Sequence, residues 1–304
     1  MRCVTLAICV FIVPCAVDAR MPKDKDPEQI GHRKVASGVN LYSLSREVQL
    51  GRELARDVER DVRIVEDPMV AEYVNRIGQN VARNSDAHFL FSVKIIRSDE
   101  INAFTLPGGH VYVTTGLIRT ADNEAELASA LSHEIAHVAA RHYTHQASLE
   151  QIVSVASIPL LFIGGWSGFV IQHGVEIATP LAFKKTSRMA EAQADRLGLQ
   201  YLYQTGYDPT AFIDFFERIA QGKDSHTGLF AKLLESHPGL QSRIRAVQKQ
   251  LQNNFEPLPR YTIQTSEFEA VQHRLADIEK GTAMPWPRRR VESFDTPPVL
   301  RRLD

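Results

Sequence analysis

Cysteine is nearly absent from this sequence, and its placement excludes two classes of site. All three cysteines lie at positions 3, 9 and 15, and none occurs in the rest of the chain. A disulfide framework and a zinc site built on cysteine thiolates are therefore excluded beyond that point. Any metal site in the remaining residues has to use histidine and carboxylate ligands.

The sequence also lacks an excess of charge of either sign. Its 35 Lys and Arg residues balance 36 Asp and Glu residues, which gives a formal net charge of -1 at pH 7. Nucleic-acid-binding domains usually carry a clear basic patch. The short run Arg288–Arg290 near the C-terminus is more typical of a solvated tail. We therefore expect no nucleic acid among the partners.

Charged residues are missing from the stretch 3–17, which follows Arg2 and leads into Val17-Asp18-Ala19. A charged start, a short apolar segment and small residues before a cleavage point are typical of a signal peptide. The segment is short for a membrane-spanning helix, which needs about 20 apolar residues. We predict a signal peptide over 1–19, hence an exported, periplasmic protein, and a flexible polar lead-in over 20–44.

Hydrophobic periodicity predicts an α+β fold that is mainly helical, with one small sheet. Runs rich in aromatic and β-branched residues predict strands at 91–96 and 110–115, and we expect a loop at 101–104 between them. Apolar residues at helical spacing predict helices at 45–62, 67–83, 123–142, 187–205, 208–220, 227–235, 239–253 and 266–280. We expect one domain over 45–255, followed by a C-terminal helix and a Pro/Arg-rich tail over 256–304.

The segment His133-Glu134-Ile135-Ala136-His137 lies within the helix predicted at 123–142. Residues four apart project from one face of a helix, so His133 and His137 can bind the same tetrahedral ion. Glu134 can then reach a metal-bound water, whose pKa zinc lowers to about 7. The surrounding helix is mostly apolar, and buried histidines and carboxylates need partners. We therefore predict a zinc site with Glu134 as the general base.

A third ligand must come from elsewhere in the chain. The HExxHxxGxxH pattern would require a histidine at position 143, where this sequence has Tyr143. His142 and His145 are expected to point away from the ion and to lie at the surface. Glu191 and Asp195 share one face of the helix at 187–205, among small alanines. We predict one zinc ion per chain with Glu191 as ligand and Asp195 orienting a ligand imidazole; a surface acidic pair is the alternative.

Residues 151–175 contain no Asp, Glu, Lys or Arg. Their length permits a transmembrane helix, but a single crossing would place Glu191 on the opposite side of the membrane from His133 and His137. Pro159 and several glycines also interrupt the stretch. We expect an apolar lid or hairpin over 151–185 beside the site. Such a lid can make peripheral membrane contact through 151–175, and burial in the core is the alternative.

With these motifs the sequence resembles the HtpX-like and BepA-like zinc metallopeptidases, gluzincins that include the CAAX prenyl proteases. The resemblance covers roughly residues 40–255 and implies a zincin-type domain with an HExxH helix. It rests on four motifs in order: Asn102-Ala103-Phe104 with Pro107-Gly108-Gly109 and the following strand, HEIAH, the segment 187–195 and Ser236-His237-Pro238 with Arg243.

The resemblance also implies roles that the sequence pattern alone does not assign. His237 and Arg243 match a pair that supports the oxyanion in the transition state. In some relatives the matching histidine instead caps the zinc and keeps the enzyme latent. An extended protein or peptide substrate is expected to bind by strand addition at Asn102, Ala103, Gly109 and His110.

Together these observations predict a zinc-dependent endopeptidase, and the resemblance implies that it acts in envelope protein quality control. The BepA-like members carry a tetratricopeptide array after the peptidase domain, and the roughly fifty residues after position 255 are too few for such an array. A latent or chaperone-like zinc-binding protein acting without proteolysis is the alternative from another class. A non-proteolytic zinc hydrolase is the third interpretation.

Overall fold

The computed structural model describes residues 26–36, 38–151, 188–221, 237, 240–255 and 257–283. Several predicted segments lie outside these residues: the signal peptide, nearly all of the apolar stretch 151–185, the helix at 227–235 and the Pro/Arg-rich end of the tail. Within the described part of the chain, no helix combines the length and the apolar character needed to cross a membrane.

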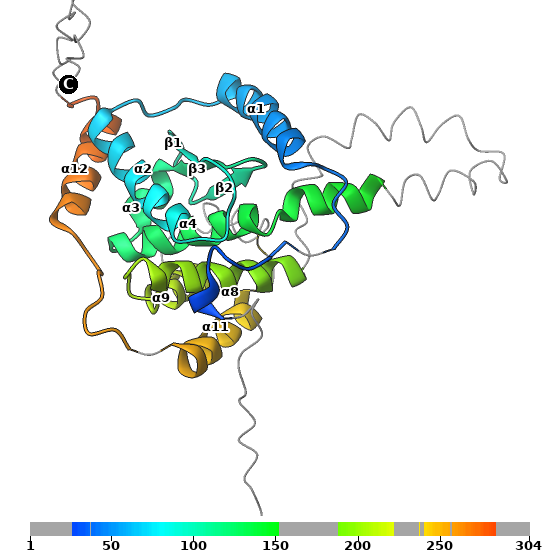
Figure 1. The fold of residues 1–304 in the computed structure, drawn as a ribbon. Helices are drawn as coiled ribbons and strands as arrows, with labels where there is room; N and C mark the ends of the chain where they lie inside the picture. Colours follow the sequence, from blue (N-terminus) through cyan, green and yellow to red (C-terminus); the bar gives the residue numbers. More distant parts are fainter. Residues whose placement is uncertain are drawn as a thin grey trace, which may run out of the picture.

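A three-stranded sheet lies above the longest buried helices (Figure 1). The strand order is β1 (Ser92–Ile96), β3 (His110–Thr114) and β2 (Ala103–Leu106), with β3 parallel to β1 and antiparallel to β2. The expectation of a loop at 101–104 was wrong, because β2 begins at Ala103. Its four residues are too few for an alternating pattern to stand out, and only pairing with β3 defines the strand.

Alternate residues of the sheet face two different helical layers, as the pleat of a strand requires. Leu106, Tyr112 and Ile96 pack against α1 (Leu44–Asp61), which covers one face. The other face carries Ala103, Val93, Ile95, Val111 and Val113, which join the main core under the sheet. Thr105, which follows Phe104 on β2, therefore points its side chain toward the helices below the sheet.

The helices below the sheet form successive layers (Figure 1). These helices and their neighbours are α2 (Pro68–Arg83), α3 (Thr115–Thr120), α4 (Glu124–Ala139), α8 (Arg188–Gln204), α9 (Ala211–Gln221), α11 (Leu240–Asn254) and α12 (Ser266–Lys280). α4 lies against the sheet, α8 and α9 lie under α4, and α11 lies under α8 and α9. The predicted mainly helical α+β class is confirmed, whereas α3 was not predicted.

Local sequence signals fix several helix boundaries. The Asp67 side chain accepts a hydrogen bond from the backbone N–H of Val70, with Pro68 at the first helical position, as the sequence predicted. α4 ends earlier than the predicted 142, because Arg141 adopts a left-handed backbone conformation with φ 57°. Helical residues resume at 142–151.

α9 begins at Ala211 rather than at the predicted 208. The Asp208 side chain accepts hydrogen bonds from the backbone N–H and the hydroxyl of Thr210, so it closes a turn ahead of the helix. An aspartate followed by proline suits such a turn as well as it suits a helix cap. The sequence alone could not distinguish the two.

Close packing of α4 on α8 forms the centre of the molecule. Every residue of α4 except Ala130 is buried. A β-carbon added at Gly198 of α8 would lie 3.1 Å from both the N and Cα atoms of His133. The two backbones therefore approach as closely as only a glycine allows. Side chains on the facing sides of α4 and α8 therefore lie close together.

Residues 26–36 pack on the protein, although the sequence predicted a flexible lead-in there. They begin with the short 3-10 helix η1 (Pro27–Gln29). Arg33 and Val35 follow and are buried, with 7% and 5% of their surface exposed. One charged and one apolar residue make these contacts, so the segment shows no periodicity by which sequence analysis could recognise it.

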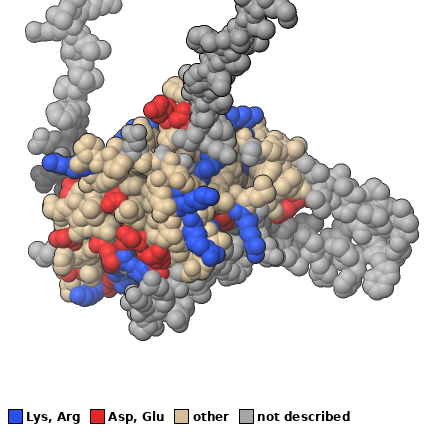
Figure 2. All heavy atoms as spheres, turned by 90° about the horizontal axis from the view of Figure 1, so that it is seen from below, with Lys and Arg blue, Asp and Glu red and all other residues tan. Residues whose placement is uncertain are grey.

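Charged residues of both signs occur on the face seen from below (Figure 2). This mixture agrees with the near-zero net charge of the chain. Exposed ion pairs such as Arg76 with Glu267 contribute little to stability, because water screens them. The charges with large energetic consequences are the buried ones described next.

Candidate metal centre

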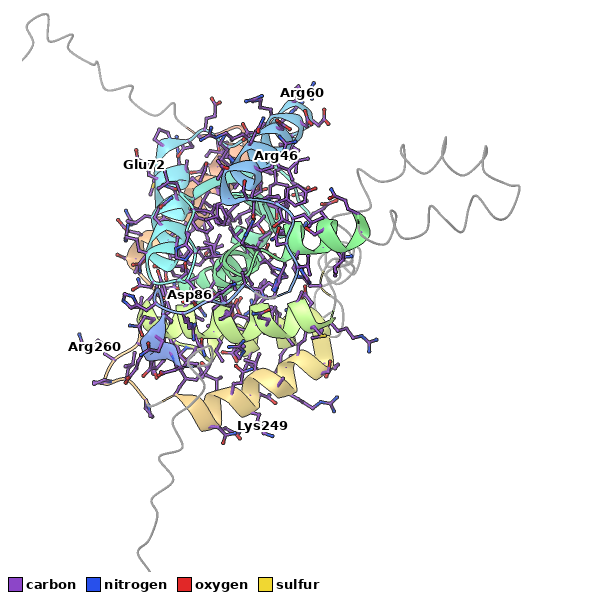
Figure 3. All side chains as sticks on the ribbon, turned by 45° about the vertical axis from the view of Figure 1, so that its right-hand side comes forward. Arg46, Arg60, Glu72, Asp86, Lys249 and Arg260 are labelled. Atoms are coloured by element: carbon purple, nitrogen blue, oxygen red, sulfur yellow. The ribbon has the colours of Figure 1, made fainter. Side chains whose placement is uncertain are left out.

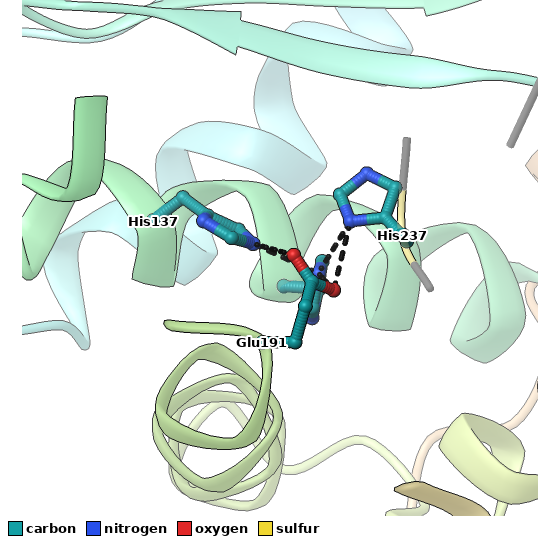
Figure 4. Close-up of side chains that lie close together, drawn as sticks. His137, Glu191 and His237 are labelled. Atoms are coloured by element: carbon teal, nitrogen blue, oxygen red, sulfur yellow. Dashed lines mark hydrogen bonds and ion pairs between the residues drawn. The ribbon is translucent and has the colours of Figure 1, made fainter. Parts of the chain in front are cut away.

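Four buried side chains bring potential ligand atoms together between α4 and α8 (Figure 4). His133 and His137 come from α4, Glu191 from α8, and His237 lies shortly before α11. The Nε2 atoms of His133 and His137 are 3.0 Å apart. Glu191 Oε1 lies 3.4 Å from His137 Nε2, and Glu191 Oε2 lies 3.5 Å from His133 Nε2. The structure thus brings together the three ligands predicted from sequence.

His237 supplies a fourth atom to this cluster. Its Nδ1 lies 3.0 Å from Glu191 Oε2 and 3.3 Å from His133 Nε2. Its Nε2 lies 3.3 Å from Glu134 Oε1, so the ring stands between the cluster and the predicted base. Sequence analysis assigned His237 only by resemblance, because a single histidine before a proline carries no spacing signal.

The donor set fits a tetrahedral zinc ion. Zinc–nitrogen and zinc–oxygen bonds of about 2.0–2.1 Å imply ligand–ligand distances of about 3.3–3.4 Å in a tetrahedron. The observed distances range from 3.0 Å between the two α4 histidines to 3.5 Å between His133 and Glu191. Glu191 Oε1 is also buried without a hydrogen-bond partner. A buried acceptor without a donor is costly, and a cation at this point would satisfy it.

Asp195 and Arg243 support the cluster from the α8 and α11 sides. Asp195 Oδ1 lies 3.1 Å from His133 Nδ1, a close contact rather than an aligned hydrogen bond. Arg243 donates to both oxygens of Asp195, at 2.7 and 2.6 Å. Its Nη1 lies 2.8 Å from Glu191 Oε2. The structure therefore places this guanidinium between two carboxylates.

These contacts keep both carboxylates charged. Burial by itself would raise the pKa of Asp195, but the hydrogen bonds and charge of Arg243 lower the pKa below its usual value. Burial likewise acts to raise the pKa of Glu191, but the charge of His237 and the hydrogen bonds from His133 and His237 hold this pKa well below its usual range. An ionised Glu191 is the form that can bind a metal.

Glu134 is buried beside the cluster, with 2% of its surface exposed. Its Oε2 accepts a hydrogen bond of 3.2 Å from the hydroxyl of Thr105 on β2. No sequence pattern indicated this contact, because residues near Thr105 were expected to form a loop. Because side chains alternate between the two faces of a strand, β2 directs Thr105 toward α4. Recognising this strand in the sequence would have indicated the contact with Glu134.

His142 occupies a different place from the one predicted. It was expected at the surface, yet only 6% of it is exposed. Its Nδ1 lies 3.0 Å from Nδ1 of His137, and its Nε2 lies 3.2 Å from Oε1 of Gln193. The left-handed residue Arg141 ends α4 and turns the ring back toward it. Burial lowers the pKa of His142 to about 4, so the ring is neutral at neutral pH. His145 remains partly exposed and contacts the backbone carbonyl of Val39.

An apolar cavity opens beside Glu134 and His237. Among the described residues it is also lined by His133 of the cluster, by Arg243 and by Ala103, Leu117, Ala130, Phe215, Phe216 and Leu240. Ala103 is thus one of the predicted substrate-binding residues that the structure places next to the cluster. Its neighbour Asn102 is buried and has an Oδ1 atom without a hydrogen-bond partner.

The other two predicted substrate-binding residues lie apart from the cluster. His110 pairs with Leu106 in the sheet, and its charged neighbours are Glu59, Lys94 and Arg52 on the α1 side. Gly109 has a φ of 98°, and a β-carbon there would come within 2.5 Å of the Leu90 carbonyl oxygen. Backbone geometry therefore requires this glycine whether or not substrate approaches it.

Comparisons with known proteins place most of the chain in a peptidase family. The profile described as peptidase family M48 matches residues 68–251, which is more than half of the chain. The beta-barrel assembly-enhancing protease of Escherichia coli (strain K12) is 29% identical over 243 residues, covering 76% of this chain and 48% of the relative.

Two further relatives are also named as peptidases. A putative beta-barrel assembly-enhancing protease of Vibrio cholerae is 28% identical over 283 residues, covering 89% of this chain and 57% of its own length. The mitochondrial metalloendopeptidase OMA1 of Schizosaccharomyces pombe is 32% identical over 186 residues, covering 59% of this chain and 52% of its own length. The chain thus spans about half the length of the curated relatives it matches.

Proposed function

The chain belongs to peptidase family M48, and on this basis we propose that it is a zinc-dependent endopeptidase. In this proposal His133, His137 and Glu191 hold one zinc ion and Glu134 is the general base. The observation that carries it is the convergence of buried histidine nitrogens and a carboxylate, at the spacing of tetrahedral ligands, directly beside a second buried carboxylate.

The side chains around the ion have distinct tasks. When bound, zinc supplies a Lewis acid that lowers the pKa of a water molecule to about 7. Glu134 accepts the proton from the attacking water, and the Thr105 hydroxyl holds the orientation of its carboxylate. Asp195 lies against the far nitrogen of His133 and limits rotation of that ring.

The position of Arg243 favours a supporting role. Its three donor nitrogens face Asp195, Glu191 and the backbone oxygen of His237. A guanidinium engaged in this way holds the ligand carboxylate in place from behind. We therefore propose Arg243 as a positioning residue. The role in oxyanion stabilisation implied by the resemblance then falls to His237, whose Nε2 faces Glu134.

Proteins or peptides bound in extended form are the proposed substrates. β2 lies at one edge of the sheet, and its residue Thr105 contacts the base Glu134. A peptide added along this edge would pass in front of the base, and the main chain of the strand would supply hydrogen bonds. The apolar cavity lined by Ala103, Phe215 and Phe216 suits an apolar side chain of that peptide.

We further propose that the protein is exported and acts on envelope proteins. The signal-peptide pattern in residues 1–19 supports export to the periplasm. Two of the relatives are named for enhancing β-barrel assembly, which supports a role in envelope protein quality control.

Zinc content and casein cleavage test the proposed activity, with Glu134→Gln as the decisive variant. We expect about one zinc per chain in both proteins, because Glu134 is not a ligand, and loss of cleavage only in the variant. Absence of zinc from both proteins would refute the metallopeptidase proposal. The exposed substitution Glu72→Gln on α2 is a matched control and should retain both properties.

A latent form is the second candidate, and the position of His237 favours it. With Nδ1 in the ligand cluster and Nε2 facing Glu134, this ring occupies the space that the attacking water needs. Zinc in the wild type without cleavage, together with cleavage in His237→Ala, would establish latency. If His237→Ala changed neither basal cleavage nor zinc affinity, a gating role for this residue would be excluded.

A further inference from the structure

The segment 26–36 is anchored to the body of the protein by a buried ion pair. The side chains of Arg33 and Asp86 are 1% and 0% exposed and approach to 2.9 Å. Asp86 also accepts hydrogen bonds from the Gly31 backbone and from the Tyr201 hydroxyl of α8. In Figure 3, Asp86 lies where η1 meets the helical layers. The segment is therefore fixed in position relative to α8.

Val35, two residues beyond the ion pair, is buried between the two central helices. It belongs to one buried apolar cluster with Ile135 and Ala136 of α4 and with Ala194 and Leu197 of α8. Its backbone oxygen accepts a hydrogen bond of 2.8 Å from Nε2 of Gln193. The carbonyl can only accept, so this contact fixes which end of the Gln193 amide faces Val35 and which end faces His142.

This orientation determines which atom donates in each hydrogen bond from Gln193 through His142 to His137. Oε1 of Gln193 lies 3.2 Å from Nε2 of His142, so that nitrogen must donate. A neutral imidazole has one donor and one acceptor, so Nδ1 of His142 accepts. Nδ1 of His137, 3.0 Å away, must therefore carry the proton that it donates. The lone pair of His137 is then on Nε2, the atom that faces the ligand cluster.

We propose that Gln193 and His142 are positioning residues that hold His137 in the tautomer and orientation required of a metal ligand, with the Val35 carbonyl as the fixed end of the chain. The proposal rests on the proposed function for the identity of the ion. Hydrogen bonds of this kind to a ligating histidine typically change metal affinity by about 10–100-fold when they are removed. Through His142 and Gln193, the N-terminal segment contributes to the metal centre although it supplies no ligand.

Substitutions along the chain of hydrogen bonds should have graded effects. His142→Phe removes the direct acceptor and should weaken zinc binding by about 10–100-fold. His142→Gln can still offer an oxygen to His137 and should recover part of that loss. Gln193→Leu leaves His142 in place but frees its tautomer, so a smaller loss of a few-fold is expected. His273→Phe at an exposed position and Gln146→Leu at a partly exposed position are the matched controls and should bind zinc like the wild type.

Two measurements on the full chain test whether Gln193 and His142 hold His137 in this tautomer. Zinc dissociation constants are obtained by competition with a chromophoric chelator. Imidazole ¹⁵N shifts of the zinc-free protein report the tautomers directly, and we expect a protonated Nδ1 on His137 and a protonated Nε2 on His142 in the wild type. The second measurement requires no substitution, so it remains decisive if a variant does not fold.

The outcomes separate this inference from the proposed function. A wild-type protein that binds no zinc contradicts the proposed function, and the tautomer measurement then still tests the hydrogen-bond chain. Wild-type zinc binding with unchanged dissociation constants in His142→Phe and Gln193→Leu overturns the inference alone. A His137 ring protonated on Nε2 in the zinc-free wild type overturns it as well.

Discussion

Replacing Arg243 by methionine tests whether this residue holds the metal centre together or acts only on the substrate. The guanidinium donates to both oxygens of Asp195 and lies 2.8 Å from Glu191, with 5% of its side chain exposed. Burial acts to lower the pKa of Arg243, but the two carboxylates outweigh burial and raise it, so the side chain stays charged. Methionine has a similar length and no charge, and therefore leaves two buried carboxylates without their cation.

The expected loss of stability follows from the cost of an unpaired buried charge. Removing one partner of a buried ion pair typically destabilises a protein by about 3–5 kcal/mol. For a domain of this size, that loss corresponds to a fall in Tm of roughly 10 °C. Arg243→Lys keeps the charge but cannot bridge both carboxylates, so an intermediate fall is expected. Zinc would neutralise Glu191 in place of the arginine, and its stabilisation of the folded state should recover part of the loss.

Thermal unfolding in the presence of chelator, and again with excess zinc, measures both effects. Arg245→Met is the matched control, because Arg245 is exposed on the same helix and its replacement should leave Tm nearly unchanged. Cleavage assays on the same proteins give kcat separately. A variant with wild-type Tm in chelator and a lowered kcat would refute the positioning role and assign Arg243 to the substrate.

Two further predictions concern packing and pH. Gly198→Ala should lower Tm and weaken zinc binding, because a methyl group 3.1 Å from the α4 backbone costs about 1–3 kcal/mol and moves α8, which carries Glu191. Ala192→Gly is the control, because it changes an exposed position of α8 and should lower Tm alone. Unchanged zinc affinity in Gly198→Ala would contradict this reasoning. Burial acts to raise the pKa of Glu59, but Lys94 and Tyr112 outweigh it and lower that pKa, so the Glu59 carboxylate stabilises the fold above its ordinary pKa and loses this effect as the pH falls below it. Glu59→Gln should therefore reduce Tm by at most a few degrees at pH 7, corresponding to at most about 1 kcal/mol, and by less at a pH below the ordinary carboxyl pKa. Equal differences at both pH values would contradict the assignment.

The sequence by itself determined those parts of the site that depend on local geometry. Helical spacing brings His133 and His137 to one face whatever the rest of the chain does. The same spacing aligns Glu191 with Asp195, and the absence of cysteine limits the ligands to histidine and carboxylate. The start of α2 at Pro68 was equally predictable, because its cap lies one residue away.

Tertiary structure alone decided the contacts between segments far apart in the chain. Thr105 reaches Glu134 only because β2 pairs with β3, and Arg243 reaches Asp195 only because α11 packs on α8. The prediction that His142 lies at the surface was wrong because the left-handed residue Arg141 turns the His142 ring back toward α4. Sequence periodicity reports which side of one element is buried, whereas these partners depend on how separate elements pack against each other.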